Sequence, residues 1–139
     1  MAQQQTYTLD NWPVDRWPNF GFGEIACRHT GDCAIDPDFM DSVQKLRVLV
    51  NAPLTVTSFY RSPDHPVEAS KKKKGAHTYG RAVDIQCSGA TAHAVLRAAC
   101  ELGFTGIGIA QTGDHSGRFI HLDGMSADDG FPRPALWSY

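Results

Sequence analysis

Two histidines and one aspartate form the pattern with the clearest chemical meaning in this chain. His77 and Asp84 lie seven residues apart around Gly80, and His121 follows much later in an apolar segment, Phe-Ile-His-Leu-Asp. Two imidazoles and a carboxylate make three protein ligands, and a three-ligand zinc site keeps its fourth position open for water. An open position distinguishes a catalytic zinc from a structural one. The pattern therefore predicts a zinc ion (Zn2+) and a metallohydrolase.

Taken one at a time, these residues have simpler roles. His77 alone fits a loop histidine, and His121 alone fits a core histidine. Asp84 alone fits a buried carboxylate that pairs with Arg81 or Arg118. Together they favour a site, because a histidine in the middle of an apolar strand needs a polar partner and a zinc ion would supply one.

The bulk properties describe an ordinary globular chain. The 139 residues suffice for one domain, and 42% hydrophobic with 20% charged residues argues against disorder. A net charge of -2 gives no general attraction to nucleic acid. We see no run long enough to span a membrane and no signal peptide at the start. We therefore expect a monomer with no nucleic-acid partner and no membrane insertion, cytoplasmic as synthesised.

The hydrophobic pattern predicts an α+β fold over residues 1–139. Residues 1–20, rich in Gln, Trp and Pro, should form an extended wrap, and residues 124–139 an irregular tail that packs against the sheet. Strand pairing across hairpins favours a small antiparallel sheet with flanking helices over a parallel one. The expected elements are helices from the N-cap Asp36 to Asn51 and over 91–102, and strands over 54–60, 81–87, 104–110 and 118–123.

Two further groups of residues invite a functional interpretation. Lys71 to Lys74 are four consecutive lysines, which predict a solvated loop. Cys27 and Cys33 enclose His29 and Asp32, which raises a second metal site, but their spacing matches no common zinc motif. The simpler prediction is a turn with free, buried thiols packed beneath it.

The metal pattern and its flanks resemble the zinc D-alanyl-D-alanine carboxypeptidase family. That family includes phage L-alanyl-D-glutamate endopeptidases and shares its fold with the hedgehog signalling domain. The similar segments occur in family order over roughly residues 20–125. They are Phe22-Gly-Glu-Ile-Ala-Cys27-Arg28, the helix from Asp36, Thr57-Ser-Phe-Tyr-Arg61-Ser-Pro63, His77-x-x-Gly80-x-Ala82-x-Asp84 and Phe119-Ile-His121-Leu-Asp123.

The resemblance implies a role for each matching residue. His77, Asp84 and His121 would bind zinc, and Arg61 would hold a substrate carboxylate or the oxyanion. Guanidinium geometry agrees with this role, because it suits planar carboxylates, although Arg61 is equally compatible with a surface position. The implied activity is hydrolysis of amide bonds in peptidoglycan stem peptides, of either the D,D-carboxypeptidase or the L,D-endopeptidase type.

The chain departs from the family where the general base is expected. Many members carry an acidic residue or a histidine three residues before the last zinc histidine, and here that residue is Arg118. A guanidinium stays protonated and accepts no proton. Asp114 or His115, in the loop before the strand, is the predicted base. Asp123 is a third candidate, with orientation of His121 as its commoner role.

These expectations lead to two functions from different classes. The first is a phage or prophage cell-wall lytic enzyme that acts on the wall after release. The second is a catalytically inactive, zinc-stabilised binding module of the same fold, which Arg118 favours. In the second case, replacement of Asp114 or His115 would leave the function unchanged.

Overall fold

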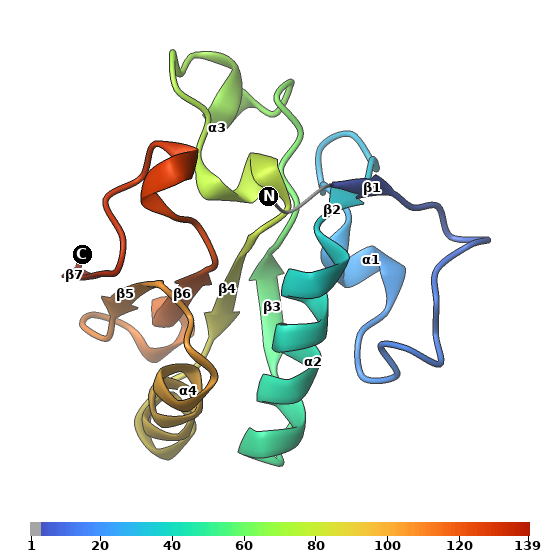
Figure 1. Cartoon of the computed structure of the whole chain (residues 1–139). Coiled ribbons are helices and arrows are strands. Elements are labelled where there is room, and N and C mark those ends of the chain that lie inside the picture. The colour runs from blue at the N-terminus through green and yellow to red at the C-terminus, as the bar shows by residue number, and fades with distance from the viewer. Residues whose placement is uncertain (1–3) are drawn as a thin grey trace.

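A five-stranded sheet organises the computed structural model, which describes residues 4–139 (Figure 1). The strand order is β3-β4-β6-β5-β7, and every neighbouring pair is antiparallel except β5 and β7, which are parallel. Helices flank this sheet, so the predicted α+β class is confirmed. The strands are β3 (Thr55–Ser58), β4 (Ala82–Gln86), β5 (Gly106–Ala110), β6 (Phe119–Asp123) and β7 (Ala135–Ser138).

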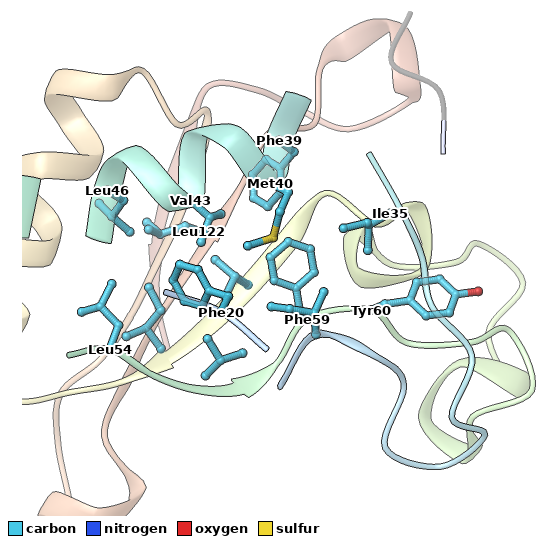
Figure 2. Close-up of a cluster of buried hydrophobic side chains, with 14 of the residues drawn as sticks. Phe20, Ile35, Phe39, Met40, Val43, Leu46, Leu54, Phe59, Tyr60 and Leu122 are labelled. Carbon is cyan, nitrogen blue, oxygen red and sulfur yellow. The ribbon is translucent and has the colours of Figure 1, made fainter. Parts of the chain in front are cut away.

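The two faces of the central strands have opposite characters. Val83, Ile85, Ile120 and Leu122 are buried in the hydrophobic core, which they share with residues of both long helices. Figure 2 shows part of this core, where Leu122 lies among side chains of helix α2. Because side chains alternate along a strand, the residues between these positions project from the opposite face. Asp84 and His121 lie on that opposite face, directly across from each other in the register.

The two long helices begin and end at residues suited to those positions. Helix α2 spans Pro37–Val50, and the Asp36 carboxylate accepts a hydrogen bond from the Asp38 N–H at 2.9 Å. The helix ends at Asn51, as predicted, and the Asn51 backbone is left-handed. Helix α4 spans Gly89–Leu102 and begins two residues earlier than predicted, because Ser88 takes the N-cap position.

The N-terminal segment lies against the body through its tryptophans. Trp12 and Trp17 are buried, and the Trp17 indole N–H donates to Asp41 at 2.8 Å. Strand β1 (Gln5–Thr6) pairs with β2 (Ala34–Ile35), and helix α1 (Phe22–Ile25) follows the wrap. The expected wrap began at residue 1, but Met1 to Gln3 lie outside the described residues.

Strands β4, β5 and β6 begin one or two residues later than expected, and two further predictions about extended segments need correction. Strand β3 covers only Thr55–Ser58 of the expected 54–60, because its register slips between Val56 and Ser58 and the Tyr60 N–H then donates to Ile25 instead. The tail over 124–139 is not wholly irregular, since β7 extends the sheet beyond β5. The two prolines of the tail precede β7, so they leave the hydrogen bonds of this strand intact.

Short helical turns surround the outward face of the sheet. They are helix α3 (Pro66–Ala69) and the 3-10 turns η1 (Ala76–Tyr79), η2 (His115–Gly117) and η3 (Ala127–Asp129). Figure 1 shows α3 and the C-terminal segment beyond the same end of the sheet, away from α4. Within residues 4–139, no helix combines the length and the hydrophobicity needed to cross a membrane.

Gly80 forms the bend that brings His77 close to β4. Its φ of 66° lies in the left-handed region, and its N–H donates to the His77 carbonyl at 3.1 Å. A Cβ at this position would clash with the Ile35 Cα and would lie 2.5 Å from the Ala34 carbonyl oxygen. Both the backbone conformation and the space therefore require glycine.

We expect Gly80→Ala to lower the free energy of unfolding by more than about 3 kcal/mol, because left-handed strain adds to a clash with backbone atoms. Gly113→Ala is the matched control, since Gly113 has a φ of 80° but no other atom within 4 Å of the place that a Cβ would occupy. The control should lose only about 1–2 kcal/mol. Urea unfolding of both variants measures the difference, and equal losses would contradict the packing argument.

Candidate metal centre

Three elements bring His77, Asp84 and His121 together. His77 comes from η1, Asp84 from β4 and His121 from β6, and their ligand atoms all lie within 4.8 Å of one another. Both histidines are buried and Asp84 is nearly so. The three side chains singled out from the sequence therefore form one cluster.

The Asp84 carboxylate lies between the two imidazoles. Its Oδ2 is 3.3 Å from His77 Nε2, and its Oδ1 is 2.9 Å from His121 Nδ1. Burial alone would raise the pKa of Asp84, but hydrogen bonds with His121 and His77 outweigh it and hold the pKa well below its ordinary value. Asp84 is therefore an anion throughout the neutral range, as a metal ligand must be.

Each histidine also has an acceptor for the ring nitrogen that faces away from Asp84. His77 Nδ1 lies 2.7 Å from the Phe59 carbonyl oxygen, and His121 Nε2 lies 2.8 Å from Asp123 Oδ2. When a metal binds, the outer nitrogens keep their hydrogens, whereas His77 Nε2 and His121 Nδ1 give up the hydrogens that bond Asp84 and become lone pairs for the ion. Metal-binding histidines in proteins are oriented by bonds of this kind.

Two of the spacings between these atoms are close to those around a zinc ion. Ligands about 2.0–2.1 Å from a tetrahedral zinc ion lie roughly 3.3 Å from one another. The distances from the Asp84 oxygens to the two inner nitrogens, 3.3 and 2.9 Å, are close to this value. The cluster can therefore hold zinc through His77 Nε2, Asp84 and His121 Nδ1.

Asp123 links His121 to the C-terminal segment. This carboxylate is fully buried, and the Arg133 guanidinium donates to both of its oxygens, at 2.9 and 2.7 Å. Burial alone would raise the pKa of Asp123, but the bonds from His121 and Arg133 outweigh it and lower the pKa. Gly106 on the neighbouring strand makes room, since a Cβ there would clash with this carboxylate. Asp123 thus takes the orienting position beside His121.

A cleft of about 360 Å³ opens beside the cluster. Arg61 and Lys71 lie along its edge, and aromatic side chains supply an apolar wall. The Trp137 ring centroid lies 5.3 Å from that of His121, and the Tyr139 ring centroid lies 5.0 Å from that of Phe119. The cleft is lined by the cluster together with Arg61, Lys71, Gly75, Ala76, Phe119, Asp123, Phe131, Arg133, Trp137 and Tyr139.

Hydrogen bonds from both its backbone and its side chain hold Arg61 beside the cluster of His77, Asp84 and His121. Its backbone N–H donates to the His77 carbonyl at 3.2 Å, and its guanidinium donates to Ser58 Oγ at 3.0 Å and to Glu68 Oε2 at 3.2 Å. The side chain lines the cleft while most of it is covered. This position suits a group that binds an anionic part of a substrate.

The two candidates for the general base lie on the hairpin loop between β5 and β6, outside the cleft. Asp114 and His115 are exposed on that loop and are not among the described residues that line the cleft. Arg118 donates through Nε and Nη2 to the Gly113 carbonyl, at 3.0 and 2.9 Å. The assignment of Asp114 or His115 as the base stays a prediction, and it requires the loop to move toward His121.

The cysteines form no second site in the part of the chain that the structure describes. Cys27, Cys33 and Cys87 are buried free thiols, and Cys100 is an exposed one. Burial raises the pKa of Cys33 to about 12, so this thiol stays protonated. Within residues 4–139, the His77, Asp84 and His121 cluster is the one group of at least three such side chains close enough to share a metal ion.

Several residues at the cleft carry little sequence signal that points to a site. Arg133 lies in the tail expected to be irregular, and only its pairing with Asp123 reveals its importance. The run of lysines predicts a solvated loop, yet the Lys71 ammonium bonds Glu68 at 3.0 Å and Lys71 lines the cleft. The one available signal was Glu68 itself, an acidic residue just before four lysines.

Comparison with known proteins gives one match. The family described as Peptidase M15 matches residues 18–123, which is most of the chain and includes all three cluster residues. No curated protein and no solved structure matches significantly.

We expect Asp123→Asn to weaken zinc binding by about 10- to 100-fold, because an amide orients His121 less firmly than a carboxylate. Competition with a chromogenic chelator measures the affinity. Asp129→Asn is the control, since Asp129 forms a carboxylate–arginine pair with Arg81 at 2.8 Å without touching the cluster. An unchanged zinc affinity in Asp123→Asn would show that Asp123 has no part in metal binding.

Proposed function

Because the chain belongs to the Peptidase M15 family of zinc-dependent peptidases, we propose that it hydrolyses amide bonds in the stem peptides of peptidoglycan. The observation that carries the proposal is the three-ligand cluster beside an open cleft. Three protein ligands leave a coordination position for the reaction, whereas structural zinc sites are usually closed by four. A peptide can approach this position through the cleft, between Arg61 and the aromatic wall.

The residues of the site have separate roles in the reaction, in metal binding and in substrate binding. When bound, zinc polarises the scissile carbonyl and activates a water molecule for attack. His77, Asp84 and His121 hold the ion, and the hydrogen bond from His121 Nε2 to Asp123 keeps Nδ1 available as the ligand atom. Arg61 binds a substrate carboxylate or the oxyanion, because a guanidinium offers two parallel donors to such groups.

Proton transfer is assigned to the loop between β5 and β6. We propose that Asp114 or His115 takes the proton of the attacking water and returns it to the leaving amine, after the loop closes over the cleft. Asp123 suits the task less well, because it is fully buried and already engaged by His121 and Arg133. We also propose that the enzyme acts in phage or prophage lysis, as a D,D-carboxypeptidase or an L,D-endopeptidase.

One observation favours a second function, that of an inactive zinc-stabilised binding module. Among the described residues that line the cleft, the carboxylates are Asp84, which faces both histidines, and Asp123, which is paired with Arg133. Arg118 occupies the position where a base is expected and is bonded to a backbone carbonyl. In that case the cleft would bind wall peptides without cleaving them.

The test combines zinc content with the release of new amino groups from purified peptidoglycan. We expect about one zinc per chain and hydrolysis in the wild type, and loss of both in His77→Ala. His93→Ala is the control, because His93 is exposed on α4 and should behave as the wild type. A zinc-loaded wild type that releases no amino groups would contradict the peptidase and favour the binding module.

The same assay separates the two candidates for the base. If either residue is the base, Asp114→Asn or His115→Ala lowers kcat by about 10²- to 10⁴-fold while the zinc content stays unchanged. If hydrolysis is normal in both variants, the base does not lie on this loop. Mass spectrometry of the released products then identifies which stem-peptide bond is cleaved.

A further inference from the structure

A buried carboxylate organises the loop that forms one edge of the cleft. The Glu68 side chain is fully buried, and its Oε1 accepts from the Gly75 N–H at 2.8 Å and from Thr78 Oγ1 at 3.2 Å. Its Oε2 accepts from Lys71 Nζ at 3.0 Å and from Arg61 Nη1 at 3.2 Å. Burial alone would raise the pKa of Glu68, but these bonds outweigh it and lower the pKa to about 2.

Glu68 therefore fixes two cations at the cleft rather than one. Because Lys71 Nζ and Arg61 Nη1 bond the same oxygen, the two nitrogens lie at most about 6 Å apart. Both side chains line the cleft. Among the described residues, Glu68 is the one acceptor of the Lys71 ammonium, which has three N–H donors. With 41% of its side chain exposed, Lys71 can offer the other two donors to a ligand.

The charge at the cleft favours an anionic ligand once a metal is bound. Three cationic side chains line the cleft, Arg61, Lys71 and Arg133, together with two carboxylates, Asp84 and Asp123. The buried Glu68 carboxylate pairs with Arg61 and Lys71 and balances the third cation. With both histidines neutral, a divalent metal leaves a net charge of +2, so the cleft is suited to a ligand with more than one negative charge.

We propose that Lys71 is a substrate-binding residue that selects stem peptides with a free side-chain carboxylate over the same peptides with a carboxamide. The proposal rests on the peptidase function proposed above and names part of its substrate class. Arg61 binds one anionic group of the peptide, and Lys71 binds a second carboxylate beside it. Glu68 holds both cations in place and keeps their mutual repulsion low.

The neighbouring lysines have other roles. Lys73 lies over the Phe131 ring, 4.1 Å from its centroid, and Lys74 Nζ donates to the Glu68 carbonyl at 2.8 Å. Lys72 is exposed and is not among the described residues that line the cleft. The run of four lysines thus presents a single residue, Lys71, to the cleft. Lys72 is the matched control for the loss of one charge from this loop.

The test uses a synthetic stem peptide and its analogue in which one side-chain carboxylate is a carboxamide. We expect the wild type to prefer the free acid by about tenfold in kcat/KM, in line with a hydrogen bond between charged groups. Lys71→Gln should raise KM for the acid peptide and leave KM for the carboxamide peptide unchanged, which abolishes the preference. Lys72→Gln and Lys71→Arg should both retain it.

A second readout separates this proposal from the peptidase function. Calorimetric titration of the zinc-free protein with both peptides measures recognition without hydrolysis, and the Lys71→Gln variant should bind them equally. If Lys71→Gln weakens the binding of both peptides to the same degree, Lys71 acts only through Glu68 and the proposal is overturned. A wild type that cleaves both peptides equally also overturns it but leaves the peptidase intact, whereas cleavage of neither rejects the peptidase itself.

Discussion

The central constraint in this structure is a carboxylate held between two imidazoles. Asp84 faces His77 on one side and His121 on the other, within a face of the sheet that also has to stay open to a cleft. Buried without compensation, such a carboxylate would be protonated or destabilising. Hydrogen bonds from both histidines keep it charged, and a zinc ion that replaced their hydrogens would stabilise all three groups at once. The bend at Gly80 and the antiparallel pairing of β4 with β6 serve this arrangement.

A second layer of interactions determines what the cluster can do. Phe59 and Asp123 orient the two histidines, and Arg133 ties Asp123 to the C-terminal segment that supplies the aromatic wall. Glu68 bonds two cations that line the same cleft, Arg61 and Lys71. The three-residue cluster, the wall and the cations therefore depend on each other through a few buried carboxylates. This dependence explains why a short tail and a lysine-rich loop belong to the site.

Much of the fold and the metal cluster could be predicted from the sequence, because each depended on local patterns. The N-cap Asp36, the alternation around Asp84 and the glycine between His77 and the strand are all short-range signals. The parallel pairing of β7 with β5 could not be predicted, because it joins segments with no shared pattern. Lys71 was also missed, since a run of lysines indicates solvation unless the buried partner is known. Asp114 and His115 remain predictions, because the structure places both outside the cleft.

The zinc K-edge absorption spectrum of the purified, zinc-loaded protein tests the metal centre most directly. A zinc ion bound by His77, Asp84 and His121 should show nitrogen and oxygen neighbours alone, at about 2.0–2.2 Å, with the multiple-scattering signal of two imidazoles. His121→Ala should lose one imidazole or the metal. Sulfur at about 2.3 Å would instead place the zinc on cysteine, and the cluster of His77, Asp84 and His121 would not be the metal centre.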